Sequence, residues 1–381
     1  MKILYIIDKM KNYAGIERIL TCKMNYLAQQ TTYDVYLTTY EQQAHPLPFP
    51  LDSSIIYNPL DVIMPQRNEM TLSQWLKAYI SARRRFQHQF ESLINDIRPN
   101  IVVSTVYSYQ VLDVIINICH QRGIKTVMES HTQGETVTLS YKFKYNQYLF
   151  KLFSFWECKI KKSLKHCNCI VSLTEQDIPF WQKYAKRIEI IPNMLTITPK
   201  KVADYELKRA MSAGRYMSEK GFDMLLEAWH LLPEEYKDWH LFIFGNGDRS
   251  AYQKIVDKYK MERCVHLMPA TDDIAEEFSK SSLYVMSSRY EGFGLVLAEA
   301  MSCGLPCISF DCPYGPREII KDGEDGLLAK YKDVEDLAHK MALLMSDAEL
   351  RLKMGGRAIK NIERYEPQTI MNQWINLFET L

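Results

Sequence analysis

The strongest constraint on the fold is a regular alternation of short apolar runs with segments of helix length. The strands predicted in the first half occupy residues 2–7, 34–38, 101–104, 125–128, 169–173 and 189–191. They are nearly continuous in Ile, Val and Leu, as parallel strands covered on both faces are. Helices are predicted between them at 16–29, 72–97 and 109–122. This alternation favours a doubly wound α/β architecture.

The alternation pauses at Pro192 and resumes after Tyr205, which indicates a linker between two domains. Strands are then predicted at 209–213, 240–244, 264–267, 283–286 and 306–309, and helices at 220–231, 249–260, 274–279 and 295–302. A length of 381 residues also fits about two domains. We therefore predict two Rossmann-like domains, 1–195 and 196–365, facing a cleft at the carboxyl ends of their sheets. The last helix, 366–381, can pack on either domain, including by crossing back to the first.

The start of the chain and its cysteines both favour a cytoplasmic protein. The apolar run after Met1 is too short for a signal peptide or a membrane span, and it ends at Asp8. The nine cysteines are scattered, without a C-x-x-C pair or a common zinc spacing. We expect them to be reduced thiols.

The net charge of +1 conceals two oppositely charged halves. Residues 1–195 contain 23 Lys and Arg against 16 Asp and Glu, whereas the remainder contains 24 against 30. Such a basic half suggests contact with an anion, although two ordinary solvated surfaces can differ this much by chance. Residues 141–167 contribute seven lysines and one acidic residue, interleaved with aromatic side chains. This pattern suits a helix lying on anionic lipid, or an ordinary helix with a core-facing aromatic stripe.

The most informative motif runs from Ser287 to Glu299, follows a predicted strand and opens a predicted helix. Gly292 and Gly294 allow a ligand to approach the backbone, and the free amides of a helix N-terminus favour an anion. Glu291 precedes the helix and Glu299 lies inside it, so the two carboxylates can meet different groups of one ligand. Alternatively, both residues have a structural role: Glu291 is an acidic residue at a helix start, and Glu299 lies at the edge of the core.

Two further turns follow predicted strands in the same half. Arg215 and Lys220 come after 209–213 and can supply the positive charge that a diphosphate needs. A basic pair of this kind is also common in solvated loops. The glycine turn Gly245-Asn246-Gly247 comes after 240–244.

In this order, these segments resemble the carboxyl-terminal half of the family 4 retaining glycosyltransferases, which have the GT-B fold. The resemblance is dense over about residues 209–330. It is carried by Gly214-Arg215…Lys220-Gly221, Gly245-Asn246-Gly247, Glu291…Glu299, Cys303-Gly304-Leu305-Pro306, the stretch 311–318 and Asp322-Gly323…Asp325-Gly326-Leu327-Leu328.

The resemblance implies a role for each matching residue. Arg215 and Lys220 would hold the donor diphosphate and neutralise the leaving group. Glu291 would contact the donor sugar, and Glu299 the ribose. The implied donor site is completed by backbone amides at the helix start and by residues around the nucleoside, namely Phe293, Gly294, Leu295, Val296, Gly245, Asn246 and Met268. Pro269-Ala270 departs from the glycine that the family usually has there.

The first half matches the family more loosely. Ala14-Gly15-Ile16-Glu17-Arg18 resembles its G-G-x-E-R loop, with Ala14 replacing the first glycine. Gly15 would let the helix N-terminus approach the diphosphate. His131 ends a predicted strand and resembles the family's active-site histidine, so we expect it to point toward the cleft and to contact the sugar. A structural hydrogen-bonding role is the alternative for this histidine.

The implied activity is transfer of a hexose or N-acetylhexosamine, with retention of configuration, to a saccharide or lipid-linked saccharide in surface polysaccharide synthesis. The 311–317 stretch looks most like relatives that use UDP-sugars.

The chain has no D-x-D triplet, so we expect neither a metal ion nor another cofactor. Arg215, Lys220 and helix dipoles would then stabilise the leaving nucleotide. In the family, retention is usually explained by front-face attack, in which the departing phosphate takes the acceptor's proton. Peripheral contact with the inner face of the cell membrane, through 141–167, would suit a lipid-linked acceptor.

Two rival functions stay open. The resemblance implies that 1–195 binds the acceptor and 196–365 the donor nucleotide-sugar. A sugar-nucleotide epimerase also has two Rossmann-like halves, but it does not need a basic acceptor-binding domain. A non-catalytic sensor would bind a sugar nucleotide without turning it over. Nucleic acid is not an expected partner, because the basic residues form no known binding module.

Overall fold

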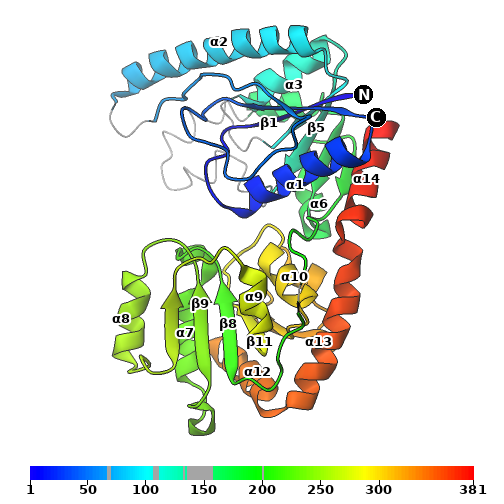
Figure 1. Cartoon of the computed structure of the whole chain (residues 1–381). Helices are drawn as coiled ribbons and strands as arrows, with labels where there is room; N and C mark the ends of the chain where they lie inside the picture. Colours follow the sequence, from blue (N-terminus) through cyan, green and yellow to red (C-terminus); the bar gives the residue numbers. More distant parts are fainter. Residues whose placement is uncertain (67–69, 106–110, 132–133, 135–157, 200) are drawn as a thin grey trace. The chain divides into compact units, whose positions relative to one another are not determined.

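The computed structural model describes residues 1–66, 70–105, 111–131, 134, 158–199 and 201–381. The chain forms two compact units. Unit 1 comprises Met1–Pro192 together with Ile370–Leu381, and unit 2 comprises Asn193–Thr369. Each unit contains one parallel sheet flanked by helices (Figure 1). The predicted doubly wound α/β architecture is therefore confirmed.

The sheet of unit 1 has the strand order β3-β2-β1-β4-β5-β6-β7, and every neighbouring pair is parallel. The order reverses direction between β1 and β4, which is the topological switch point of this sheet. The strands are β1 (Lys2–Ile7), β2 (Asp34–Thr39), β3 (Ile56–Tyr57), β4 (Ile101–Ser104), β5 (Lys125–Ser130), β6 (Cys169–Ser172) and β7 (Ile188–Ile190).

Helices cover both faces of this sheet. α2 (Leu72–Ile97) and α3 (Leu112–Gln121) bury apolar side chains against Leu4, Ile6 and Val102, while α1 (Gly15–Gln30) lies on the other face (Figure 1). α2 begins at Leu72 because Thr71 and Gln74 form a capping box. The short helix α6 (Ile178–Trp181) packs its Trp181 side chain into a separate apolar cluster, with Met128 and Ile170.

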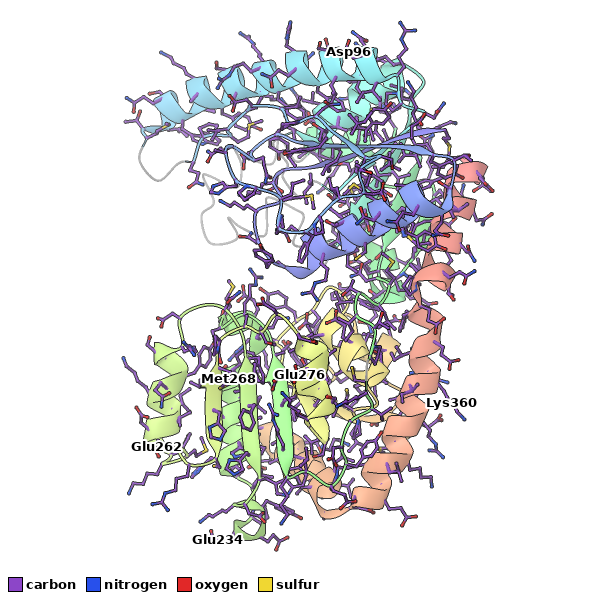
Figure 2. The ribbon with its side chains drawn as sticks, viewed as in Figure 1. Asp96, Glu234, Glu262, Met268, Glu276 and Lys360 are labelled. Carbon is purple, nitrogen blue, oxygen red and sulfur yellow. The ribbon has the colours of Figure 1, made fainter. Side chains whose placement is uncertain are left out.

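The sheet of unit 2 has the parallel order β10-β9-β8-β11-β12-β13 and reverses between β8 and β11. Its strands are β8 (Arg209–Ala213), β9 (His240–Phe244), β10 (Val265–Met268), β11 (Leu283–Met286), β12 (Cys307–Phe310) and β13 (Gly326–Ala329). Its helices are α7 (Phe222–His230), α8 (Ser250–Lys258), α9 (Ile274–Ser279), α10 (Leu295–Ser302), α11 (Pro316–Ile319), α12 (Val334–Ser346) and α13 (Ala348–Ile362). Figure 2 shows Met268, which ends β10, and Glu234, which precedes β9, toward opposite ends of the sheet.

The last helix, α14 (Pro367–Thr380), joins unit 1 from Ile370 onward. It buries an apolar stripe that includes Trp374 and Phe378. Its polar residues add contacts within unit 1: the Tyr33 hydroxyl donates to Glu379 at 3.2 Å, and the Arg187 guanidinium donates to the Thr380 hydroxyl at 3.1 Å. Unit 1 is therefore assembled from two separate stretches of sequence.

The structure shows the state of the cysteines and the length and polarity of the helices. All nine cysteines are free thiols, and six of them are buried. Within the described ranges, every helix is too short or too polar to span a lipid bilayer.

Candidate active site

The motifs of unit 2 gather at the carboxyl edge of its sheet. Gly214 and Arg215 follow β8, Gly245 follows β9, and the loop that carries Glu291 follows β11. Because β8 and β11 are neighbours on either side of the strand reversal, the basic loop and the Glu291 loop flank the switch point. Doubly wound sheets bind ligands in the crevice at this position.

Glycine allows these loops to pack backbone against backbone. A Cβ atom on Gly245 would lie 1.9 Å from the carbonyl oxygen of Gly214, and one on Gly221 would lie 2.1 Å from that of Ser287. Gly221 also has a φ of +62°, which favours glycine. Two hydrogen bonds join the loops after β8 and β9: Gly214 N donates to Phe244 O at 2.9 Å, and Tyr216 N to Asn246 O at 2.8 Å.

An ion pair joins the two loops at the switch point. The Lys220 ammonium donates to Oε1 of Glu291 at 2.7 Å, and the Ser288 hydroxyl donates to the same oxygen at 2.5 Å. The Lys220 and Glu291 side chains are 23% and 11% exposed, so the pair is partly shielded from water. The alkyl chain of Lys220 runs past Gly214, where a side chain would crowd it. These contacts fix the position of the ammonium.

Arg215 has a different environment from Lys220. Its side chain is exposed, and no carboxylate in the described part of the chain pairs with it. Arg289, by contrast, is neutralised by two hydrogen bonds to Asp223, at 2.8 and 2.6 Å. Of these two arginines, Arg215 is the one that keeps its charge available to an anionic ligand.

Helix α10 begins directly after the glycine motif. Gly294 has a φ of +94°, and Leu295 is the first helical residue, so the amides of Leu295 and Val296 lie in the first turn. Phe293 is buried, and its carbonyl oxygen would lie 2.1 Å from a Cβ atom on Gly315. The Leu295 and Val296 amides therefore lie at the carboxyl end of β11, where anion binding is predicted.

Glu299 and Met268 both make contacts inside unit 2. Glu299 is buried, and its Oε1 accepts a hydrogen bond from the Thr196 hydroxyl at 2.5 Å. The Met268 carbonyl accepts from Gly245 N at 3.2 Å and from the Tyr216 hydroxyl at 3.1 Å. Asn246 is exposed in the turn beside them. The sequence pattern contains no signal for the Thr196 contact, because Thr196 lies in the linker.

In unit 1, Gly15 is the first residue of α1, and Ala14 provides no side-chain cap for that helix. His131 directly follows β5, and its side chain is buried beside Glu129 and Lys23. Burial, followed by repulsion from Lys23, holds the pKa of His131 well below its usual range. The imidazole is therefore neutral near pH 7.

The lysine-rich segment is described only in part, because residues 141–157 lie outside the described ranges. Residues 158–164 are helical. Ile160 and Leu164 pack into the cluster that contains Trp181, while Lys159, Lys162 and Lys165 are exposed. In the part of the chain that the structure describes, no three His, Cys, Asp or Glu side chains gather in a metal-binding arrangement.

Curated relatives match part of the chain. An uncharacterized glycosyltransferase of Haemophilus influenzae is 35% identical over 212 residues, covering 55% of this chain and 60% of the relative. The poly(ribitol-phosphate) alpha-N-acetylglucosaminyltransferase of Staphylococcus aureus is 31% identical over 168 residues, covering 44% of this chain and 34% of the relative. The chain thus spans about a third to three fifths of the length of these two relatives.

Solved structures match the whole chain at low sequence identity. Sucrose-phosphate synthase from Thermosynechococcus elongatus has a TM-score of 0.79 at 16% identity, covering 100% of this chain and 99% of its own. Anabaena HepE in complex with UDP has a TM-score of 0.69 at 14% identity, covering 100% of both chains. These similarities confirm the predicted GT-B fold.

A family model matches the part of the chain that carries the Lys220–Glu291 ion pair. Residues 195–361 match the family described as glycosyl transferases group 1. This range contains the β8, β9 and β11 loops and helix α10. Residues 195–361 are therefore similar to the glycosyl transferases group 1 family.

Proposed function

We propose that the chain is a retaining, metal-independent glycosyltransferase that moves a hexose or N-acetylhexosamine from a UDP-sugar to a saccharide or lipid-linked saccharide. The observation that carries the proposal is the Lys220–Glu291 pair at the strand reversal of unit 2, beside the exposed Arg215 and the first turn of α10. HepE has been crystallised with UDP, and the Staphylococcus aureus relative is named as an N-acetylglucosaminyltransferase, which supports this donor class.

In this proposal, fixed positive charge replaces a metal ion. An ammonium has three donor hydrogens, so Lys220 can keep Glu291 and still donate to a phosphate oxygen. Arg215 adds a planar guanidinium, and the α10 amides add partial positive charge. These groups would stabilise the nucleoside diphosphate as its bond to the donor sugar breaks. Gly15, His131 and Glu299 keep the roles that the family resemblance implies.

The donor class is tested by thermal unfolding with UDP and with GDP. We expect UDP at ~100 times its dissociation constant to add roughly 2.7 kcal/mol to the free energy of unfolding. GDP at the same concentration should raise the melting temperature less. Equal or greater stabilisation by GDP would contradict the assignment of a UDP-sugar donor.

Product analysis separates the transferase from its two rivals. With UDP-sugars that stabilise the protein, we expect release of UDP and transfer to a saccharide acceptor, and proton NMR should show the donor's anomeric configuration in the product. An epimerase would change the configuration of the sugar nucleotide without needing an acceptor. A sensor would bind the sugar nucleotide and leave it intact.

We also propose that unit 1 contacts anionic membrane through the lysine-rich segment. Each basic residue near an anionic surface contributes about 1 kcal/mol, and this attraction is screened over roughly 8 Å at physiological salt. In flotation assays we expect binding to phosphatidylglycerol vesicles that weakens as the salt concentration rises. Binding should fall when four lysines of the segment are replaced by serine, namely Lys159, Lys161, Lys162 and Lys165.

The matched control replaces four exposed lysines of unit 2 with serine, namely Lys237, Lys254, Lys258 and Lys332. This control should float like the unmodified protein, and both variants should keep their affinity for UDP. Absence of flotation at low salt would remove the membrane contact and favour a water-soluble acceptor. It would leave the transferase proposal in place.

A further inference from the structure

A groove runs along the outward face of α3 in unit 1. Figure 1 shows α3 next to α2, and Ile115 of α3 belongs to the apolar cluster that α2 also joins. On its other side, Ile116 of α3 packs with Ile160 and Leu164 of the helical segment 158–164. The outward face of α3 is therefore flanked by a helix on each side. A hollow of about 450 Å³ lies between these helices.

Polar side chains at helical spacing line this hollow. Positions 113, 117 and 121 of α3 are four residues apart, so they share one face of that helix and form the floor. Positions 83 and 87 of α2 form one wall, and positions 159, 162, 163 and 166 form the other. The polar lining consists of Arg83, Gln87, Asp113, Asn117, Gln121, Lys159, Lys162, Ser163 and His166. Three neighbouring segments thus present polar stripes to the same hollow.

The described lining carries an excess of positive charge. Its acid, Asp113, is buried and pairs with the Arg83 guanidinium, so these two charges offset each other. Lys159 and Lys162 are exposed and add two positive charges along one wall. The hollow is therefore electrostatically suited to an anion.

Neutral donors accompany the two lysines. Asn117 on the floor is exposed and has an amide N–H₂ group. His166 is also exposed, and its ring centroid lies 4.2 Å from that of His120. A phosphate has several acceptor oxygens, which can be shared among ammonium, amide and imidazole donors. The volume also lies within the range of small-ligand sites, roughly 300–1,000 Å³.

We propose that this groove is a phosphate-binding site, which takes the phosphate of an anionic lipid headgroup or of a water-soluble phosphate ester. Lys159 and Lys162 supply the charge, and Asn117 and His166 donate further hydrogen bonds. The site is built from unit 1 alone, whereas the donor-diphosphate residues Arg215 and Lys220 belong to unit 2. The inference deepens the proposed contact of unit 1 with anionic membrane and rests on that proposal only for the source of the phosphate.

An NMR titration of the full chain with inorganic phosphate tests the site directly. The side-chain amide signals of Asn117 and Gln121 report on the floor, and Asn117→Ala and Gln121→Ala identify them. We expect these signals to shift with phosphate, and to stay in place with sodium chloride at the same ionic strength. In Lys159→Ala/Lys162→Ala the affinity for phosphate should fall by about tenfold or more, because charge-assisted hydrogen bonds are lost.

Lys161→Ala/Lys165→Ala is the matched control, because it removes the same charge from the same segment. Lys161 lies over the Tyr184 ring at 5.4 Å and Lys165 is exposed, and the described lining of the hollow includes neither. This control should keep its phosphate affinity within about twofold, since attraction by exposed charges outside the site is screened by salt. Melting temperatures check that both double variants fold. Equal losses of affinity in the two variants, or floor signals that respond alike to phosphate and chloride, would overturn the inference.

Flotation with phosphatidylglycerol vesicles identifies the source of the phosphate. If the groove takes a lipid headgroup, Lys159→Ala/Lys162→Ala should lose more vesicle binding than the control, and glycerol phosphate should compete with the vesicles. If it takes a water-soluble ester, the two variants should float alike, while glycerol phosphate still shifts the Asn117 signals. Equal loss of flotation without any phosphate response would remove the groove and leave the membrane contact. Both variants should keep their affinity for UDP, so failure of the transferase proposal would be seen separately.

Discussion

Replacing Lys220 by alanine is expected to weaken UDP binding by roughly 10- to 150-fold, because a hydrogen bond to a charged group is worth about 1.5–3 kcal/mol. Arg215→Ala should weaken UDP binding within the same range. Glu291→Gln should behave differently, since Glu291 pairs with Lys220 and is proposed to meet the sugar. Its affinity for UDP should stay the same or tighten, because the carboxylate no longer competes for the ammonium. Its rate of sugar transfer should fall.

Titration calorimetry with UDP on the three variants measures these effects, and transfer assays complete the comparison. Lys280→Ala is a suitable control, because Lys280 is also ion-paired in unit 2 but caps α9 through Glu276 and Glu277. It should bind UDP like the unmodified protein. The proposed roles are wrong if Glu291→Gln loses UDP binding while Lys220→Ala keeps it.

Two adjacent glycines in α13 are expected to respond to alanine with opposite changes in stability. A Cβ atom on Gly355 would lie 2.1 Å from the Gly304 carbonyl oxygen and 2.4 Å from the Tyr205 hydroxyl, which itself donates to that carbonyl at 2.9 Å. Gly355→Ala should therefore destabilise unit 2 by about 1–3 kcal/mol through overpacking. A Cβ atom on Gly356 meets nothing within 4 Å, so Gly356→Ala should stabilise the helix by roughly 1 kcal/mol.

Urea unfolding of each variant, monitored with a probe placed in unit 2, measures the difference in stability between the two variants. Neighbouring positions in one helix share the same intrinsic helix propensity, so the opposite signs would isolate the close contact of α13 with the Gly304 backbone. Shifts of the same sign in both variants would show that the contact is looser than the structure indicates. UDP affinity should be unchanged in both folded variants.

The sheets were largely predictable because buried parallel strands leave continuous apolar runs. The ranges predicted at 209–213 and 283–286 coincide with β8 and β11. β3 was missed because Ile56–Tyr57 is too short to form a pattern, and β13 was missed because Gly326–Ala329 opens with a glycine in a turn-rich stretch. The strand order that brings β8 beside β11 follows from the doubly wound topology, which the alternation of elements indicates.

The sequence proposes the candidate site residues one by one, but it does not predict which of them contact each other. Lys220 and Glu291 were each assigned to a ligand, whereas in the structure they contact each other across 71 positions of sequence. Lys23 and Glu129 are separated by 106 positions and belong to different elements, so no local pattern joins them. The burial of His131 beside Glu129 was not predictable for the same reason, because this contact depends on tertiary packing. Local sequence patterns identify residues of a suitable type for a site, but tertiary packing decides which side chains contact each other.

The return of α14 to unit 1 has a consequence for the order of folding during synthesis. Asn193–Thr369 is continuous and can fold as soon as it has left the ribosome, whereas residues 1–192 emerge earlier but lack their last helix. Until Trp374 is made, Lys23 has no aromatic cover. The amino-terminal unit is thus begun first and completed last, so a nascent chain that stops before Trp374 leaves it unfinished. Translation itself therefore delays the maturation of the half that contains His131 until α14 has been made.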